Sequence, residues 1–212
     1  MDLYSGLPYW IAKNSLYDYF NPLSHDYKKD VIVIGSGITG ALVAHELCKA
    51  GIEAALVDKR SLVTGSSVAS TALLQYEIDV PLCEMVKKVG DAKAVAAYHS
   101  CLESITAIER VFHDIQANPD FLRIPSVYYA SDKKGLQLIE EEYAVRKKYG
   151  LPVTLLYNKE LRDEYGIDAP GALKNTESAQ MDCYAAAIKL ITYHMKRKEL
   201  DVFTNTEITE YN

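Results

Sequence analysis

The sequence predicts an α/β fold built around a parallel sheet. Three observations predict it: an apolar run at 31–34, a glycine-rich turn at 35–40, and a carboxylate, Asp58, directly after a second apolar run at 54–57. A strand, a glycine turn, a helix and a second strand that ends in an acid form the unit that binds dinucleotides in Rossmann-like domains. The order of the elements therefore predicts a nucleotide cofactor as well as a fold.

The glycine turn predicts contact with phosphate. Gly35 lets the backbone leave the strand in a tight turn, a side chain at Gly37 would hold a phosphate away from the main chain, and one at Gly40 would push the next helix off the strand. The helix then begins with free N–H groups and a dipole that favours an anion. The residues predicted to hold the diphosphate are Gly35, Ser36, Gly37, Ile38, Thr39 and Gly40.

The flanking elements agree with this interpretation. Residues 31–34 are continuously apolar, which is typical of a parallel strand buried on both faces. Mostly small residues, among them Ala41, Ala44 and Cys48, recur at helical spacing, so the helix can lie close to the sheet. Gly51 is placed to end that helix.

Asp58 lies about twenty residues beyond the glycines, where a carboxylate accepts hydrogen bonds from ribose hydroxyls. An acid at this position disfavours a cofactor with a 2′-phosphate, because two anions would meet. Lys59 and Arg60 weaken that argument. They are either cofactor contacts or a solvated strand end.

A second segment rich in small residues, 65–75, follows Asp58. Its hydroxyl and alanine side chains allow a loop and a helix start to approach an extended ligand and to donate to its phosphate and sugar oxygens. The alternative is a serine-rich surface loop, but Ala69, Ala72, Leu73 and Leu74 make the segment too apolar for one. We therefore expect it to face the ligand.

Composition restricts the function classes. The chain has 212 residues, 49% of them hydrophobic and 25% charged, with a formal net charge of −6. That balance is ordinary for a globular protein and argues against nucleic acid as a partner. No run approaches the roughly 20 apolar residues of a membrane span, and no secretory signal is evident. Four dispersed cysteines without a CxxC pair predict neither a metal site nor disulfides, and a cytoplasmic location fits them.

Later segments predict further elements. A long packing helix spans 91–115 with Asp91 as its cap, and Asn118-Pro119 ends it. A strand at 122–130 contains Pro125, a helix spans 136–149, a strand spans 153–157, and Asn158 caps a short helix before a short strand at 172–174. Asp182 caps a last helix, and 202–209 holds a third strand of the first sheet. The aromatic residues of 1–28 are expected to pack on the outside of their own domain.

From Lys29 to the end, the sequence resembles FAD-dependent oxidoreductases of the D-amino-acid oxidase and glycine oxidase type. The resemblance is carried by 31–40, 58–60, the Gly65-Ser66-Ser67 turn, 70–75 and the order of the later elements. The segment 65–75 is the more diagnostic part, because NAD-binding Rossmann enzymes lack it.

The resemblance implies FAD as cofactor and gives its contacts. The glycine turn would hold the diphosphate and Asp58 the adenosine ribose, while Ile208 would flank the adenine. Five residues would run along the pyrophosphate and ribityl chain: Ser66, Ser67, Thr71, Ala72 and Leu73. Members of this family oxidise the C–N bond of amino acids or small amines by hydride transfer to flavin, so an amine or amino acid is the expected partner.

The resemblance also implies the domain organisation. Residues 1–28 would be an N-terminal extension, 29–118 and 178–212 two parts of a Rossmann-like FAD-binding domain, and 119–177 part of an inserted α+β lobe on the substrate side. Family members have a longer C-terminal half that carries most substrate-binding groups, and the sequence is expected to be an N-terminal portion, inactive by itself. We assign no catalytic side chain and no oligomeric state. An NAD-dependent dehydrogenase and a non-catalytic dinucleotide-binding or interaction module remain alternatives.

Overall fold

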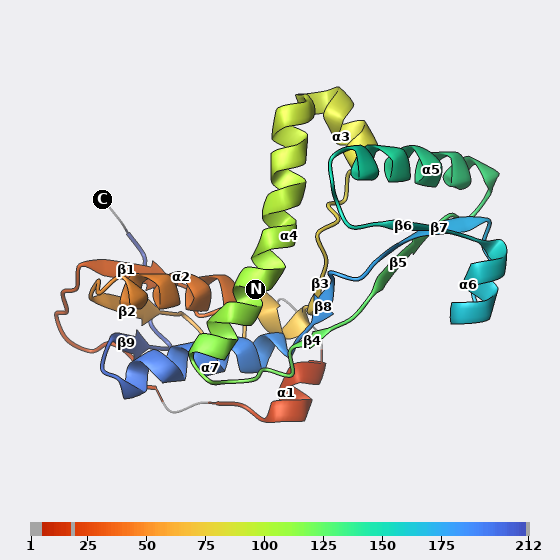
Figure 1. Cartoon of the computed structure of the whole chain (residues 1–212). Coiled ribbons are helices and arrows are strands. Elements are labelled where there is room, and N and C mark those ends of the chain that lie inside the picture. The colour runs from red at the N-terminus through yellow and green to blue at the C-terminus, as the bar shows by residue number, and fades with distance from the viewer. Residues whose placement is uncertain (1–5, 18–19, 211–212) are drawn as a thin grey trace. The chain divides into compact units, whose positions relative to one another are not determined.

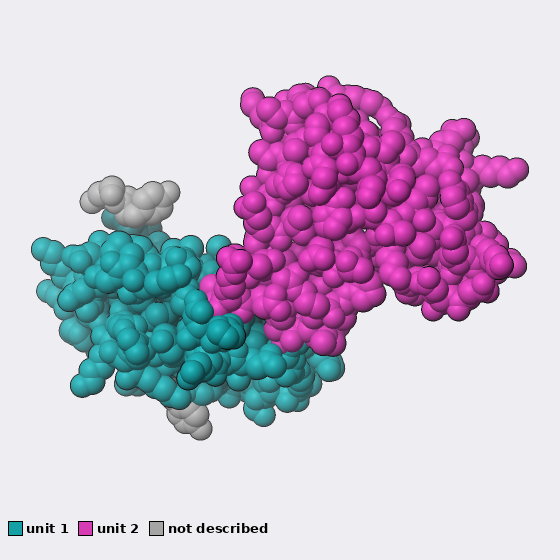
Figure 2. All heavy atoms as spheres, viewed as in Figure 1, with its two compact units in different colours: residues 1–72, 112–120, 181–212 teal, residues 73–111, 121–180 magenta. Residues whose placement is uncertain are grey.

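The computed structural model of the chain describes residues 6–17 and 20–210 (Figure 1). The chain divides into two compact units, which Figure 2 colours separately. Unit 1 comprises residues 1–72, 112–120 and 181–212, and unit 2 comprises residues 73–111 and 121–180. The domain bounds expected from the sequence remain a prediction.

Unit 1 contains the predicted parallel sheet. Its strands are β1 (Val31–Ile34), β2 (Ala54–Val57) and β9 (Leu200–Phe203), in the order β1-β2-β9. In the register, Val31 lies opposite Ala54, and Ala54 lies opposite Leu200. The central strand β2 is buried along its whole length. The third strand ends at Phe203, earlier than the sequence suggested, so residues 206–209 follow the strand instead of belonging to it.

Strand β1 corrects one prediction. The sequence suggested burial on both faces, but Ile32 and Ile34 are 45% and 63% exposed, and only Val33 is buried. Ile32 and Ile34 lie on the opposite face of the strand from Val33, and this face of β1 is left open among the described residues. An apolar run alone does not distinguish a central strand from an edge strand.

Two helices pack against each other in unit 1. Helix α2 (Ile38–Lys49) buries Ala41, Ala44 and Cys48, which is the face predicted from the sequence. Gly51 follows the end of α2 with φ of +73°, a conformation that favours glycine. Helix α7 (Cys183–Lys196) is capped as predicted, since the side chain of Asp182 accepts a hydrogen bond from Ala185 N at 2.8 Å.

A buried histidine pair joins α2 to α7. His45 Nδ1 lies 2.9 Å from His194 Nε2, and His194 Nδ1 lies 2.7 Å from Glu199 Oε2. Both imidazole rings are almost fully buried. Burial and the neighbouring His194 lower the pKa of His45, although Glu46 acts in the opposite direction.

This pair predicts a loss of stability on acidification. Since the pKa of His45 is lowered on folding, the unfolded chain binds a proton below pH ~6.5 that the folded chain does not bind, and the free energy of unfolding falls as pH falls. Urea unfolding at pH 7.5 and at pH 5.5 measures this fall. The variant His45→Asn should show a smaller fall, and an equal fall in both proteins would contradict the assignment to His45.

The N-terminal segment packs on unit 1, as predicted. Helix α1 (Tyr9–Asn14) places Trp10 so that its Nε1 donates to Ser70 O at 2.8 Å. Lys13 Nζ forms ion pairs with Asp120 at 2.6 Å and Asp182 at 3.0 Å. Residues 1–5 and 18–19, and with them Tyr4 and Tyr19, lie outside the described residues.

Unit 2 contains two antiparallel sheets. One has the order β3-β8-β4, with β3 (Leu73–Leu74), β8 (Ala179–Gln180) and β4 (Leu122–Arg123). The other has the order β5-β7-β6, with β5 (Ser126–Tyr129), β7 (Gly171–Asn175) and β6 (Thr154–Tyr157). The predicted strand at 122–130 is thus divided at Pro125 into two strands of different sheets.

Four helices accompany these sheets. They are α3 (Leu82–Val89), α4 (Asp91–Asp114), whose last residues belong to unit 1, α5 (Lys133–Lys148) and α6 (Asn158–Tyr165). The apolar stripe predicted for 91–115 is confirmed, because Tyr98, Ile105 and Phe112 are buried.

The structure differs from the sequence analysis at three local points. Asn158 is the first residue of α6 and not its cap, since Glu160 Oε2 accepts from Tyr157 N at 2.7 Å at the helix start. Segment 65–75 forms a short 3₁₀ helix, η1 (Ser66–Ala69), followed by β3, where a helix start was expected. Helix α3 was not predicted. It has only 8 residues, between Pro81 and Gly90, so its apolar residues span too few turns to show a helical period.

A buried ion pair connects α3 to α5. Both carboxylate oxygens of Glu142 accept backbone hydrogen bonds at the start of α3, from Leu82 N at 2.9 Å and from Cys83 N at 2.8 Å. Arg146 Nε donates to Glu142 Oε1 at 2.6 Å, and both side chains are almost fully buried. Burial opposes ionisation, but the hydrogen bond from Cys83 and the guanidinium of Arg146 hold the pKa of Glu142 below its ordinary value.

In the part of the chain that the structure describes, no helix combines the length and apolar character needed to cross a membrane.

Candidate cofactor-binding site

A cavity of about 400 Å³ lies in unit 1, where strands β1 and β2 end. Ligands of parallel α/β sheets bind beyond the carboxyl ends of the strands, so this is the expected place for a cofactor. The residues that line the cavity are Ile34, Gly35, Gly37, Asp58, Lys59, Arg60, Gly65, Ser66, Ser67, Thr206, Glu207 and Ile208. The structure therefore brings the glycine turn, the end of β2, the start of η1 and the segment after β9 to one cavity.

Each of the three glycines disfavours a side chain for a different steric or conformational reason. Gly35 has φ of +101°, which L side chains rarely adopt. A Cβ on Gly40 would lie 1.9 Å from Gly35 O, so α2 packs against the end of β1 at a distance that only glycine permits. A Cβ on Gly37 would lie 2.9 Å from Ser67 Oγ, where the turn meets the second segment. This cradle, which a side chain would fill, fits the close approach of a diphosphate to the main chain.

Asp58 holds the glycine turn in place. Its Oδ2 accepts hydrogen bonds from Ser36 N at 2.7 Å and from Ser36 Oγ at 2.6 Å, and its Oδ1 accepts from Arg60 N at 2.9 Å. Ser36 Oγ in turn accepts from Val63 N at 2.9 Å, and Ser36 is fully buried. The sequence assigned Ser36 to the diphosphate, but the structure turns its side chain toward the carboxylate.

The hydrogen bonds of Ser36 predict that replacing this residue lowers the stability of the protein. Replacing Ser36 with alanine leaves Val63 N–H without its acceptor and removes one donor to Asp58, so we expect the free energy of unfolding to fall by about 1–3 kcal/mol. Urea denaturation of Ser36→Ala measures this, with Ser100→Ala, at an exposed position of α4, as the control. Equal stability of the two variants would show that the bonds of Ser36 do not matter.

Part of the anion-binding capacity of the turn is already used. Ile38 N–H, the first amide of α2, donates to Ser67 Oγ at 3.0 Å, and Ser36 N–H donates to Asp58. Among the described residues, this leaves the amides of Gly37, Thr39 and Gly40 as the donors for an anion at the start of α2.

The cavity wall carries charges of both signs. Lys59 Nζ pairs with Glu207 Oε1 at 3.3 Å. The backbone also joins the two walls, since Thr206 N donates to Asp58 O at 2.9 Å and Asn205 N donates to Arg60 O at 3.2 Å. Sequence reasoning placed Ile208 here but missed Thr206 and Glu207. The signal was present, because all three residues follow a strand parallel to β2 and reach the same edge of the sheet.

Three predicted contacts lie elsewhere. Thr71 lines a separate groove of unit 1 with Trp10. Ala72 is buried with φ of +55°, and its carbonyl accepts from Met181 N at 3.2 Å. Leu73 begins β3 in unit 2. Their assignment to the ribityl chain of a flavin remains a prediction.

Comparison with known proteins gives a family match. A family model described as FAD dependent oxidoreductase matches residues 30–212. Among curated proteins, the putative Rieske 2Fe-2S iron-sulfur protein YhfW of Bacillus subtilis is 26% identical over 167 residues, which are 79% of this chain and 32% of that protein.

Solved structures share the fold. L-proline dehydrogenase from P. horikoshii superposes with a TM-score of 0.69 at 18% identity, covering 89% of this chain and 47% of that one. Glycine oxidase from Geobacillus kaustophilus superposes with a TM-score of 0.72 at 17% identity, covering 88% of this chain and 49% of that one. The chain spans about half the length of these structures and about a third of the length of YhfW.

Proposed function

This chain belongs to the family of FAD-dependent oxidoreductases, and from that premise we propose that it binds the adenosine diphosphate half of FAD in the cavity of unit 1. We propose further that the protein oxidises the C–N bond of an amino acid or a small amine. The observation that carries the first proposal is the cradle at Gly37 and Gly40, where no side chain fits and backbone amides are left for phosphate.

In this proposal, different residues of the cavity bind different parts of the cofactor. The amides of Gly37, Thr39 and Gly40 bind the diphosphate through the start of α2. Asp58, fixed by its bonds to Ser36 and Arg60, uses its remaining lone pairs to accept from ribose hydroxyls.

The outer wall completes the adenosine site. Ile208 supplies an apolar contact for the adenine, and Ser66, which lines the same cavity, donates its hydroxyl to a phosphate oxygen. The pairing of Lys59 with Glu207 neutralises a cation at the ribose end, which favours a cofactor without a 2′-phosphate.

When bound, FAD supplies the redox chemistry, and the protein supplies binding, orientation and electrostatics. Residues of this chain bind and orient the adenosine and the diphosphate. We assign no proton transfer and no contact with the reacting carbon to a residue of this chain. Four free cysteines suit a reducing compartment, and we place the protein in the cytoplasm as part of the proposal.

Support for amine or amino-acid oxidation comes from relatives of the same fold. Their names describe a proline dehydrogenase and a glycine oxidase, both of which act on amino acids. An NAD-dependent dehydrogenase would use the same glycine turn and acid, but the family match favours FAD.

The test is reduction of flavin by substrate. The whole protein, of which this chain is expected to be the N-terminal portion, is incubated with FAD, freed of excess cofactor, and titrated without oxygen against a panel of amino acids and primary amines. We expect loss of the visible absorbance of oxidised flavin with at least one of them. Retained flavin that no amine or amino acid bleaches would overturn the proposed reaction while leaving the cofactor site intact. A colourless protein would overturn both.

A further inference from the structure

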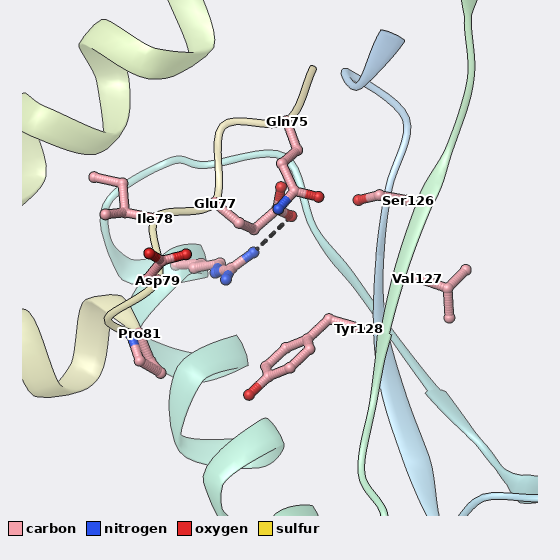
Figure 3. A pocket seen from close by; sticks show the side chains of 9 residues that line it. Gln75, Glu77, Ile78, Asp79, Pro81, Ser126, Val127 and Tyr128 are labelled. Atoms are coloured by element: carbon pink, nitrogen blue, oxygen red, sulfur yellow. Dashed lines mark hydrogen bonds and ion pairs between the residues drawn. The ribbon is translucent and has the colours of Figure 1, made fainter. Parts of the chain in front are cut away.

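Unit 2 has a pocket of its own, with a volume of about 300 Å³. Its walls come from the loop after β3, from strand β5 and from helix α5. In Figure 3 the side chains of Gln75 and Glu77 lie next to each other in this pocket, and Tyr128 projects into it from β5. Its volume is at the lower end of the range for small-molecule sites.

One buried carboxylate oxygen in this pocket lacks a partner. Glu77 Oε1 accepts from Arg146 at 3.0 Å, the contact drawn as a dashed line in Figure 3, and from Asn175 Nδ2 at 2.5 Å. Glu77 Oε2 is buried and has no hydrogen-bond partner among the described residues. Leaving a charged oxygen buried without a donor costs more free energy than leaving a neutral polar atom in the same state. A donor from a ligand would remove that cost.

The charge balance of the pocket indicates the kind of donor. Arg146 is already paired with Glu142, whose oxygen lies 2.6 Å from its Nε. Glu77 adds a second negative charge beside the same guanidinium, and Asp79 adds a third on the pocket wall. No cation pairs with Asp79 among the residues that the structure describes. A positively charged donor therefore complements the pocket, and a carboxylate or phosphate would be repelled.

Tyr128 adds an aromatic wall to the pocket. Successive residues of a strand point to opposite faces, so Tyr128 lines the pocket and its neighbour Tyr129 does not. The face of an aromatic ring attracts a cation. Tyr128 and Tyr129 are both exposed, which makes them a matched pair for a test.

We propose that this pocket binds a small organic compound through a primary ammonium group that donates to Glu77 Oε2. The exposed side chain of Gln75 lies against Glu77 and turns aside to admit the ligand. Asp79 supplies a second attractive charge, and Tyr128 covers the cation. All of these residues belong to unit 2, so the inference does not depend on the cofactor assigned to unit 1.

Calorimetric titration of the chain with n-butylamine tests the proposal, with n-butanol as the uncharged probe of similar shape. No FAD is added, so the outcome is separate from that of the flavin experiment. We expect binding of n-butylamine and none of n-butanol. Glu77→Gln should weaken amine binding about ten-fold or more, since a hydrogen bond to a charged group is lost. Glu164→Gln, an exposed acid of unit 2 that pairs with Lys174 at 2.9 Å, should leave it unchanged.

Variants of the two tyrosines provide a second test, which can still be carried out if Glu77→Gln fails to fold. Tyr128→Ala should weaken n-butylamine binding about three-fold, and Tyr129→Ala should not change it. Absence of amine binding, equal binding of n-butanol, or unchanged binding by both Glu77→Gln and Tyr128→Ala would overturn the proposal.

Discussion

Replacing Gly40 with alanine is expected to lower the free energy of unfolding by about 3 kcal/mol, at the upper end of overpacking effects. The new methyl group would lie 1.9 Å from Gly35 O and 3.5 Å from Leu56 Cδ1. The first of these is backbone, which cannot turn away as a side chain can. Relief therefore requires α2 to move off the sheet, and this movement opens the site where its first amides meet an anion.

Urea denaturation with Gly65→Ala as the control measures the effect of Gly40→Ala. A Cβ on Gly65 meets nothing within 4 Å, and Gly65 is not among the glycines with positive φ. The control should therefore differ from the unsubstituted protein by less than about 0.5 kcal/mol. Equal stability of the two variants would mean that α2 does not pack as closely against the backbone of Gly35 as the structure shows.

The second large effect is expected at Glu142. Glu142→Ala removes the acceptor of two amides at the start of α3 and takes away the nearest partner of Arg146. Removing one partner of a buried ion pair costs about 3–5 kcal/mol, and the remaining pair of Arg146 with Glu77 at 3.0 Å places the expected cost at the lower end of that range. We expect a loss of that size in the free energy of unfolding.

An exposed ion pair of the same unit is the control. Glu164→Ala breaks the pair with Lys174 at the surface and should cost less than about 1 kcal/mol. A loss below 1 kcal/mol for Glu142→Ala would contradict the role given to the pair.

The parallel sheet and the glycine turn were predictable because their signals are local. Residues 31–40 and 54–58 carry strand, turn and acid in one continuous stretch, and the structure has each element in that place. The prediction that both faces of β1 are buried needed tertiary context and was wrong. Exposure of Ile32 and Ile34 depends on what packs over that face of β1, and no property of the run 31–34 records its neighbours.

Prediction of the site from the sequence was limited in the same way. Asp58 was assigned to ribose from its spacing, but its bonds with Ser36 depend on how the turn folds back onto β2. Glu77, Asp79 and Tyr128 share a pocket although strand β5 follows the loop by more than forty positions, as the printed numbering shows. A single sequence does not report such long-range proximity.

The central claim is that the cavity of unit 1 holds the adenosine diphosphate half of FAD, and calorimetric titration of the chain with FAD tests it most directly. We predict binding by the unsubstituted protein, and binding about ten-fold weaker or more for Gly37→Leu, whose side chain would occupy the cradle beside Ser67. Glu164→Gln should bind as the unsubstituted protein does. Equal affinity of Gly37→Leu and the unsubstituted chain for FAD, or no binding by either, would contradict the claim.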